Sequence, residues 1–251
     1  TSTGVNNSDF AVKNAFVALR TPVGNGIEWK VGVFDTLVGY EVFEAGSNPN
    51  YSRSFGFFTE PITHTGVLAT YQINEIVGVA AGIANTGGNV INARPTDALG
   101  VNVEALKTYM GSVTVTAPES TGFLSGASLT AGVVDQGLNS GLGVVNLYVG
   151  GSMPLPVEGL AIGMAYDYRG NDSWGGGSAS YANAIGGYIV YQANEKLKLA
   201  GRAEYASSSN RFYYNSPDPT NNNMLFGLTV TVDYSLWDNV ITRGELRWDR
   251  E

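Results

Sequence analysis

The feature that most constrains this chain is a strict alternation of apolar and other residues in several separate segments. In segment 160–169 the two sides are Leu160, Ile162, Met164, Tyr166 and Tyr168 against Ala161, Gly163, Ala165, Asp167 and Arg169. Segments 27–35, 65–73, 197–205 and 226–234 repeat the pattern. Because successive side chains of a β-strand point to opposite faces of a sheet, a period of two predicts strands with one apolar and one polar face. The expected fold class is therefore all-β.

Short and long connections alternate between these segments. Short turns are expected at 22–26, 74–75, 117–122, 153–159, 194–195 and 235–239, with longer loops between them. Short turns at one end and long loops at the other are typical of antiparallel transmembrane β-barrels of the outer membrane. Aromatic residues near strand ends on the apolar face, such as Tyr205 and Trp248, fit an interfacial girdle. A soluble β-sandwich would show the same alternation within one strand, so connection lengths and strand lengths favour the membrane.

Twelve strands are expected in all, and no helix. The first is expected from Phe10 to Thr21, with an ambiguous register. The fifth is expected from about Ala105 to Thr116 and the sixth from Phe123 to Val134, followed by a loop from Asp135 to Gly141.

The composition limits the possible functions. A net charge of −8 argues against nucleic acid as a partner, because such proteins need a basic surface. The absence of Cys excludes disulfides and thiolate metal sites. His64 is the only histidine, so a histidine-based catalytic dyad or metal site is not expected. We expect no enzyme, no cofactor and no metal, although a barrel hydrolase using His64 is the chemical alternative.

Charged and polar residues on the polar face are the candidate pore-lining residues. In a barrel that face lines a water-filled lumen, where charges set ion preference. On a soluble sheet the same charges would only be solvated. The candidates are Glu28, Lys30, His64, Gln72, Asp167, Arg169, Lys196, Lys198, Arg202, Glu204, Arg243, Glu245 and Arg247. The residues expected to face lipid are Val31, Leu160, Ile162, Met164, Leu199, Leu228, Val230 and Leu246.

A long loop at 36–60 separates two of the alternating segments. It is too long for a tight turn, and it is rich in aromatic residues, which argues for order. We expect it to pack against the inner wall and narrow the pore, with Glu41 and Glu44 facing the basic rows of the tenth and twelfth strands. The alternative is an external loop that closes the mouth or holds a neighbouring subunit. The constriction candidates are Tyr40, Glu41, Glu44, Tyr51 and Arg53.

The stretch KVGVFDTLVGYEVFEAGSNPNYSRSFGF, followed by EPITHTGVLATYQ, resembles the OmpL-like putative beta-barrel porins of bacterial outer membranes. The resemblance is strongest from Lys30 to Gln72 and weaker in the closing GELRWDRE. It implies an outer-membrane barrel that acts as a passive channel. Such barrels end in a strand with a terminal aromatic residue, whereas this chain stops at Glu251. We therefore expect an incomplete barrel sequence without its signal peptide and terminal strand or strands, and roughly 16 or more strands when complete.

Residues 1–251 are expected to form a single β-barrel domain in the bacterial outer membrane. The expected function is a porin that lets small hydrophilic solutes or ions diffuse passively. The first alternative is a structural barrel that acts as a sleeve or anchor for another envelope component, and a soluble adhesin is a further one. The expected partners are the lipid bilayer, small hydrophilic solutes, and a homo-oligomer or another envelope protein.

Overall fold

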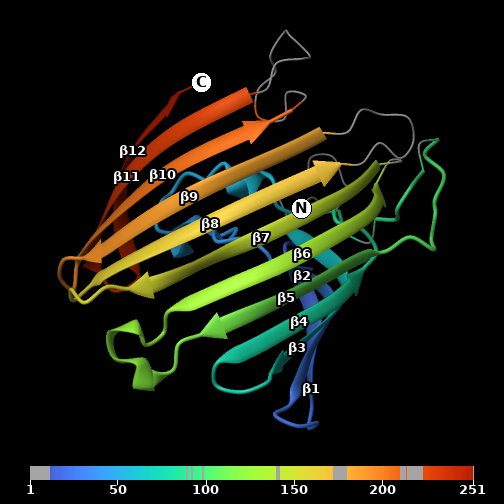
Figure 1. Ribbon diagram of the computed structural model, residues 1–251, viewed down its shortest axis with the longest axis horizontal. Coiled ribbons are helices and arrows are strands. Elements are labelled where there is room, and N and C mark those ends of the chain that lie inside the picture. The colour runs from blue at the N-terminus through green and yellow to red at the C-terminus, as the bar shows by residue number, and fades with distance from the viewer. Residues whose placement is uncertain are drawn as a thin grey trace.

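The protein forms one antiparallel sheet of twelve strands, paired in the order in which they occur in the chain (Figure 1). The computed structural model describes residues 12–88, 90–91, 93–97, 99–139, 142–171, 180–209, 213 and 223–250. No helix among these residues is long and apolar enough to cross a membrane. The all-β class and the minimum of twelve strands are thus confirmed, whereas the number in a complete barrel stays a prediction.

The strands are connected as consecutive hairpins. They are β1 (Ala15–Thr21), β2 (Ile27–Asp35), β3 (Thr63–Gln72), β4 (Val77–Ala84), β5 (Thr108–Thr116), β6 (Ser128–Asn139), β7 (Leu142–Pro154), β8 (Leu160–Asn171), β9 (Ser180–Gln192), β10 (Leu197–Ser208), β11 (Asn223–Trp237) and β12 (Val240–Arg250). Within the described part of the chain there are also three short 3-10 turns: η1 (Ala45–Ser47), η2 (Gly56–Phe58) and η3 (Glu119–Leu124). Among the described residues, β1 pairs only with β2 and β12 only with β11.

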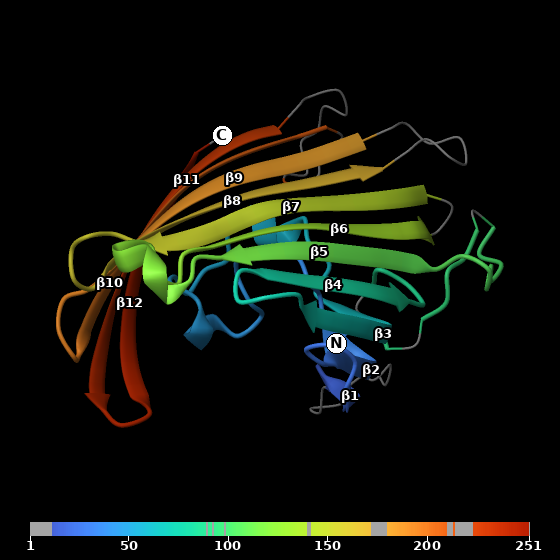
Figure 2. The same ribbon diagram turned by 60° about the horizontal axis from the view of Figure 1, so that its bottom comes forward.

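The sheet is strongly curved, and its two faces differ as the alternation predicts. Figure 2 shows the strands arching over the segment between β2 and β3, which lies on the concave side. On β11, Leu228 and Val230 are exposed on the convex face, while Thr229 and Thr231 are buried on the concave face. The expected register is therefore observed.

Cross-strand pairing lines up both faces in continuous rows. Ile162, Ile189, Gly201, Val230 and Leu246 are successive partners along β8 to β12 and form an outer row. One residue further along, Gly163, Tyr188, Arg202, Thr229 and Arg247 form the adjacent inner row. Leu246 is 81% exposed, which fits a side chain directed at lipid.

Several expected boundaries were wrong. Most of the loop expected from Asp135 to Gly141 is strand instead, because β6 continues to Asn139, with a shift of register between Asp135 and Leu138, and β7 begins at Leu142. Residues 140–141 lie outside the described residues. Such a bulge lets a hairpin continue past an irregular stretch.

The sixth strand begins at Ser128 rather than Phe123, and η3 takes the place of its expected start. Gly122 and Gly126 have positive φ angles of 66° and 80° there, which an extended strand does not allow. The fifth strand begins at Thr108 rather than Ala105, and β1 at Ala15. The expected start at Phe10 lies outside the described residues.

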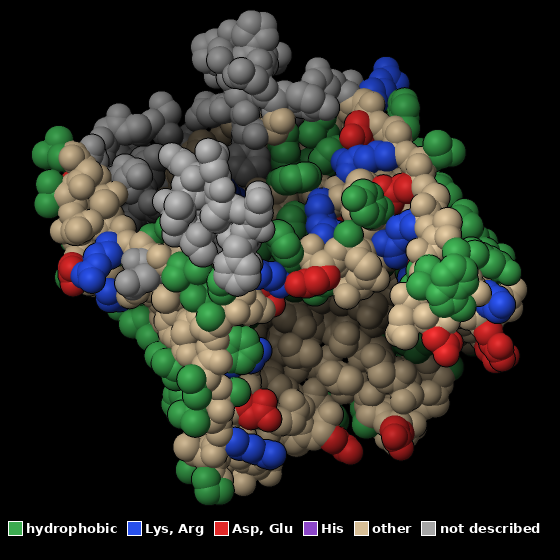
Figure 3. All heavy atoms as spheres, turned by 180° about the vertical axis from the view of Figure 1, so that it is seen from behind, with side chains coloured by type: hydrophobic (Ala, Val, Ile, Leu, Met, Phe, Trp, Pro, Cys, Tyr) green, Lys and Arg blue, Asp and Glu red, His purple; other side chains and the backbone are tan. Residues whose placement is uncertain are grey.

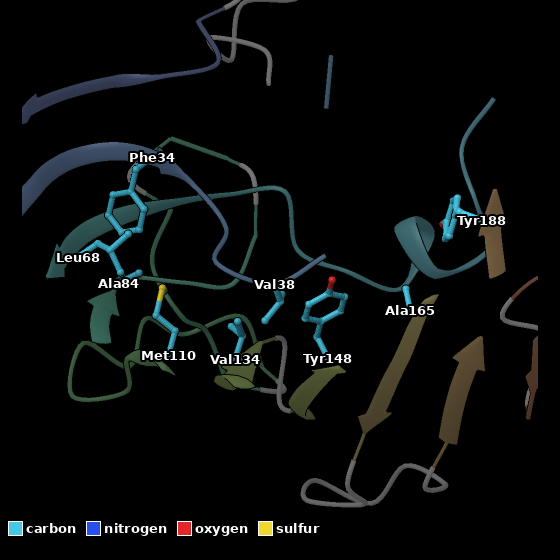
Figure 4. Close-up of a cluster of buried hydrophobic side chains, with 9 residues drawn as sticks. All are labelled: Phe34, Val38, Leu68, Ala84, Met110, Val134, Tyr148, Ala165 and Tyr188. Atoms are coloured by element: carbon cyan, nitrogen blue, oxygen red, sulfur yellow. The ribbon is translucent and has the colours of Figure 1, made fainter. Parts of the chain in front are cut away.

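The largest apolar core lies on the concave face and not between two layers. Each strand from β2 to β9 contributes one side chain to it (Figure 4): Phe34, Leu68, Ala84, Met110, Val134, Tyr148, Ala165 and Tyr188. Val38, from the segment after β2, packs on this row, and Leu37 and Tyr40 lie beside it. The sequence analysis expected no apolar cluster on the inner face, so this row adds to it.

The outer face generates a first prediction. Met164, near the middle of β8, is 62% exposed on the apolar face. Met164→Arg should lower the free energy of unfolding in lipid vesicles by about 2–4 kcal/mol, because a charge near the midplane must leave water. Met164→Leu serves as the control for loss of the methionine side chain. An unchanged denaturant midpoint for the arginine variant would mean that Met164 does not face lipid.

Candidate functional site

The segment 36–62, which we call the inner loop, connects β2 to β3 and folds into the concavity of the sheet (Figure 2). It is ordered by its own hydrogen bonds as well as by the wall. Asn48 accepts a hydrogen bond from the Val42 amide at 2.8 Å and donates one to the Val42 carbonyl at 2.7 Å. At the base of the loop the Thr36 amide donates to the Ile62 carbonyl at 2.9 Å. The order expected from the aromatic content is therefore present.

The first arm of the inner loop lies on the apolar row. The rings of Tyr40 and Tyr188 stack with centroids 4.2 Å apart. A Cβ atom at Gly163 would overlap the Tyr40 hydroxyl, so Tyr40 passes over a position that must lack a side chain. Burial of the Tyr40 ring raises the pKa of its hydroxyl. This arm is thus held by apolar contact with the wall.

The tip of the inner loop is held by a buried ionic cluster centred on Arg202 of β10. Its guanidinium donates to Glu41 of the loop at 2.8 Å and to Glu204 of β10 at 2.9 Å. The side chains of these residues are 0%, 1% and 1% exposed. Glu41 also accepts hydrogen bonds from the Ser54 amide and the Tyr188 hydroxyl. Each of the two carboxylates therefore has a charged partner, as burial requires.

The same guanidinium also binds the loop backbone. Arg202 donates to the carbonyls of Ser52 at 2.7 Å and Arg53 at 3.2 Å. Glu204 accepts from the Phe55 amide. Backbone groups that point at the wall are thereby satisfied without water, which explains why this tight loop can lie against the sheet.

Two residues of β12 extend the attachment. Glu245 accepts from the amides of Tyr51 at 2.6 Å and Ser52 at 2.9 Å. Arg247 donates to the Arg53 carbonyl at 2.5 Å, and its guanidinium lies 5.0 Å from the centroid of the Phe55 ring. The loop tip is therefore bound by both a cation and an anion of the same strand.

Arg243 of β12 fastens the part of the loop around η1. It donates to the carbonyls of Ala45 at 2.8 Å and Asn48 at 3.2 Å. Its charge is balanced by Asp233 of β11, at 2.6 Å, which also binds Lys198 of β10 at 2.9 Å. The wall charges in this region are thus paired with one another as well as with the loop.

The opposite side of the inner loop meets the N-terminal end of the chain. Lys13 lies 2.7 Å from Glu44 and 2.9 Å from Asp35. The hydrogen bond from the Lys13 ammonium lowers the pKa of Glu44. The sequence analysis expected Glu44 to face the basic rows of β10 and β12. This expectation was wrong, because Glu44 binds Lys13 instead. Glu41 does meet a basic row, but by direct contact and not across an open pore.

The second arm returns along the wall. The amide of Asn146, on β7, donates to the Thr59 carbonyl at 2.6 Å, and η2 lies against β8 and β9. His64, at the start of β3, is buried, with its Nε2 3.2 Å from the Thr36 hydroxyl and its Nδ1 3.5 Å from the Thr86 carbonyl. This places the single histidine at the base of the inner loop.

The candidate residues thus fall into three groups. Those near the inner loop fall at four places: Arg202, Glu204, Glu245 and Arg247 at its tip, Arg243 beside η1 with Lys198 linked to it through Asp233, Asp167 and Arg169 near its second arm, and His64 at its base. Glu28, Lys30 and Gln72 lie on β2 and β3, at the other end of the strand order. Lys196 lies in the turn before β10. The expectation that Arg202 and Glu204 face water is corrected, because the loop covers them.

The sequence analysis missed several residues that hold the inner loop on the wall. Asp233 neutralises Arg243, Thr231 donates to Glu245 at 2.7 Å, and Asn50 donates to Thr231 at 2.7 Å. The alternation of β11 could have found Asp233, because it occupies a polar-face position in the stretch TVTVDY. Nothing in the alternation could have found Asn50, which lies in the loop.

A hollow remains on the concave side beyond the charged cluster, as Figure 3 shows. A cavity of about 430 Å³ lies on the wall formed by β1 to β5, and Arg20, Glu28, Thr70, Gln72, Ser112 and Thr114 are among its lining residues. The lining combines hydroxyl and amide groups and one charge of each sign with apolar side chains such as Val79 and Ala80. Polar groups of this kind can replace water around a small hydrophilic solute.

A family model described as "Putative beta-barrel porin-2, OmpL-like" matches residues 2–251. No curated protein matches the sequence.

Solved outer-membrane proteins share the fold. Outer-membrane expressed OmpT of Vibrio cholerae superposes with a TM-score of 0.61 at 15% identity, over 96% of this chain and 71% of that one. In-vitro folded OmpT of Vibrio cholerae gives a TM-score of 0.56 at 15% identity, over 89% of this chain and 66% of that one. The outer membrane channel DcaP of Acinetobacter baumannii gives a TM-score of 0.62 at 13% identity, over 92% of this chain and 76% of that one. This chain therefore spans 66% to 76% of the length of these proteins.

The ionic cluster generates a second prediction. Arg202→Met removes the shared partner of two buried carboxylates, and breaking a buried pair in this way costs about 3–5 kcal/mol. We expect a loss of unfolding free energy of that size, together with faster trypsin cleavage after Arg53. Lys196→Met, in an exposed turn, is the control for loss of a positive charge. Equal stability and equal cleavage of both variants would contradict the role given to Arg202.

Proposed function

We propose a porin function on the premise that this chain belongs to the OmpL-like family of putative beta-barrel porins, whose model matches residues 2–251. The protein is an outer-membrane β-barrel, and small hydrophilic solutes or ions cross it by passive diffusion. In this proposal the protein is a channel and not an enzyme. Its role is to shape a passage through the bilayer.

The observation that carries the proposal is the attachment of the inner loop to the inner wall. A loop that hydrogen-bonds to three consecutive strands, β10 to β12, holds one shape and narrows the lumen by a fixed amount. The expected alternative, an external loop, would not place Glu41 under Arg202. We therefore assign Tyr40, Glu41, Glu44, Tyr51 and Arg53 to a constriction element.

The roles within this element differ from residue to residue. Tyr40 and Glu41 anchor it to the wall, while Tyr51, at 65% exposure, presents its ring to the space beside the loop. The lining role proposed for Glu28 and Gln72 rests on their position in the lining of this cavity. The role proposed for Lys30 rests on its place two residues after Glu28, on the same face of β2. Four charged residues of β10 and β12 are only half-buried: Lys198, Arg243, Glu245 and Arg247. We therefore assign them to the lumen wall as well as to the attachment of the inner loop.

A sleeve or anchor for another envelope component is the second candidate. It is favoured by the same feature, since a loop that contacts both the apolar row and the ionic cluster occupies part of the concave side. A filled barrel would carry no current. Conductance of the reconstituted protein therefore separates the two functions.

A homo-oligomer is proposed as the assembled form. One of the similar structures, in-vitro folded OmpT, is described as a trimer form. In this chain a groove of about 620 Å³ on the convex face, near Leu129, Met153 and Ile162, offers an apolar surface to a neighbour in the bilayer. Chemical crosslinking in native membranes would test this assembly.

Modification of the loop generates a third prediction. Tyr51→Cys should give a channel whose single-channel conductance falls when a bulky thiol-reactive cation is added, because the adduct occupies space beside the constriction. Val113→Cys, exposed on the convex face of β5, is the matched control and should not respond. The chain has no native Cys, so each reagent reacts at one position.

Two outcomes would contradict the proposal. Silent bilayers with correctly folded protein would favour the sleeve. Normal conductance that is insensitive to modification at position 51, with labelling verified by mass, would place the inner loop away from the passage.

A further inference from the structure

The wall of β1 to β5 is hollowed at the end of the strands that carries the short turns. Two adjacent inner rows cross β3, β4 and β5 there, with Thr70, Ala80 and Ser112 in one row and Gln72, Gly78 and Thr114 in the next. β4 contributes only the methyl group of Ala80 to these two rows, since Gly78 has no side chain. The wall is therefore thin at this point, and the cavity of about 430 Å³ described above lies against it. A cavity of this volume can hold a small solute.

Arg20 of β1 supplies the positive charge of this cavity. Its Nη2 donates to the Asn25 carbonyl at 2.9 Å, in the turn between β1 and β2. The Asn25 side chain in turn donates to the carbonyls of Gln72 at 3.0 Å and Ile73 at 2.8 Å, which ties the turn to β3. A Cβ atom at Gly26 would come within 2.5 Å of the Arg20 Nε, so the turn admits the guanidinium because this residue is glycine. The Asn25 carbonyl is the only partner of Arg20 among the described residues, and a guanidinium has five N–H donors, so most of them are left for a ligand.

Glu28 of β2 supplies the negative charge of the same cavity. It is the direct cross-strand partner of Arg20, a position at which opposite charges can pair. Glu28 nevertheless has no hydrogen-bond or ion-pair partner in the part of the chain that the structure describes. The turn engages the Arg20 guanidinium, and the ammonium group of Lys30, on the same face of β2, lies 5.1 Å from the centroid of the Phe16 ring. The cavity is therefore lined by one charge of each sign, and the two do not neutralise each other by contact.

Uncharged polar groups lie beside the two charges. The Gln72 Nε2 donates to the Asn74 carbonyl at 2.6 Å, which orients the side-chain amide. The Gln72 Oε1 then lies over β4, where a Cβ atom at Gly78 would come within 2.8 Å of it. The hydroxyl groups of Thr70 and Ser112 have no partner among the described residues. The cavity thus offers both acceptors and donors to the uncharged parts of a ligand.

The charges of β10 to β12 are less suited to bind a solute. Arg202 has Glu41 and Glu204 as carboxylate partners, and Arg243 has Asp233. Both guanidinium groups also donate to carbonyls of the inner loop, so a solute would have to displace the loop to reach them. The two charges that line the cavity on β1 to β5 have no printed bond to any described part of the loop, and they are open to a solute without rearrangement.

We propose that this cavity is a binding subsite for small zwitterionic solutes of the amino-acid class, in which Arg20 binds the carboxylate and Glu28 binds the ammonium group. The proposal rests on the porin function proposed above and names a class of solute for it. The planar fork of a guanidinium matches a carboxylate, and an ammonium group donates hydrogen bonds that a carboxylate accepts. A solute with a single charge would leave one wall charge without a partner, whereas a zwitterion pairs with both.

The test compares three solutes of nearly the same size. Free L-alanine carries both charges, lactate keeps the carboxylate, and alaninol keeps the ammonium group. Their binding to the purified protein in detergent is measured by saturation-transfer NMR at neutral pH and low salt, because this method detects weak ligands. L-alanine should bind about fivefold more tightly than lactate or alaninol, the factor expected for one additional ion pair in an open site.

Two variants remove the charges one at a time. Arg20→Gln should weaken L-alanine and lactate about fivefold without weakening alaninol, and Glu28→Gln should weaken L-alanine and alaninol without weakening lactate. Both side chains are exposed, so the fold should be unaffected. Lys196→Gln and Glu75→Gln, in exposed turns outside the cavity, are the matched charge controls and should bind all three solutes as the unaltered protein does.

L-alanine has no net charge, and this separates the subsite from a general field in the lumen. A change of the overall field alters the attraction of lactate and alaninol in opposite directions and leaves L-alanine almost unaffected. Loss of L-alanine binding in both Arg20→Gln and Glu28→Gln therefore requires direct contact with two charges. Ser112→Leu keeps both charges but fills the cavity, and it should abolish the binding of L-alanine.

Three results would overturn the proposal: no binding of L-alanine, equal affinity for the three solutes, or an L-alanine affinity that Arg20→Gln and Glu28→Gln leave unchanged. The binding measurements do not depend on conduction. A conducting channel that binds no L-alanine would therefore overturn the subsite and leave the porin function intact. Silent bilayers with the expected binding would overturn the porin function and leave the subsite in place.

Discussion

The buried charge of Arg202 is the interaction on which the interior of this barrel depends. An ionised group removed from water costs several kcal/mol unless charged and polar partners replace its hydration. β10 supplies only Glu204, and the inner loop supplies Glu41 and the carbonyls of Ser52 and Arg53. The wall therefore depends on the loop for the partners of Arg202, and the loop depends on the wall for the partner of Glu41. Neither arrangement is favourable alone, because each would leave charged or backbone groups buried without partners.

The inner wall has an apolar part and an ionic part, and the inner loop follows the same division. From β2 to β9 the concave face carries the apolar row, which Val38 and Tyr40 cover. From β10 to β12 it carries paired charges, which receive the loop from Glu41 onward. Curvature of the sheet brings strands that are distant in the chain within reach of a loop that leaves β2 (Figure 2). Together with the wall, the inner loop thus forms a second, small core on the concave side of the sheet.

Much of the fold could be predicted because its signal is local. A period of two decides which side of a strand each residue occupies, so Val230 and Arg202 were assigned to the correct faces without any knowledge of their neighbours. The length and aromatic content of segment 36–60 likewise indicated an ordered loop that packs on the inner wall. Phe34, Leu68 and Met110 could not be interpreted, because apolar side chains on a polar face make sense only once a loop covers them.

The sequence by itself determined the strands, their two faces, and a set of charges on the inner one. Only the tertiary structure decided which charges meet. Glu41 contacts Arg202 although the two are 161 residues apart, and Glu44 contacts Lys13. The physical reason is that alternation along a strand is a short-range property of the backbone. Pairing across the lumen depends on strand order, register and curvature, which arise only when all twelve strands are in place.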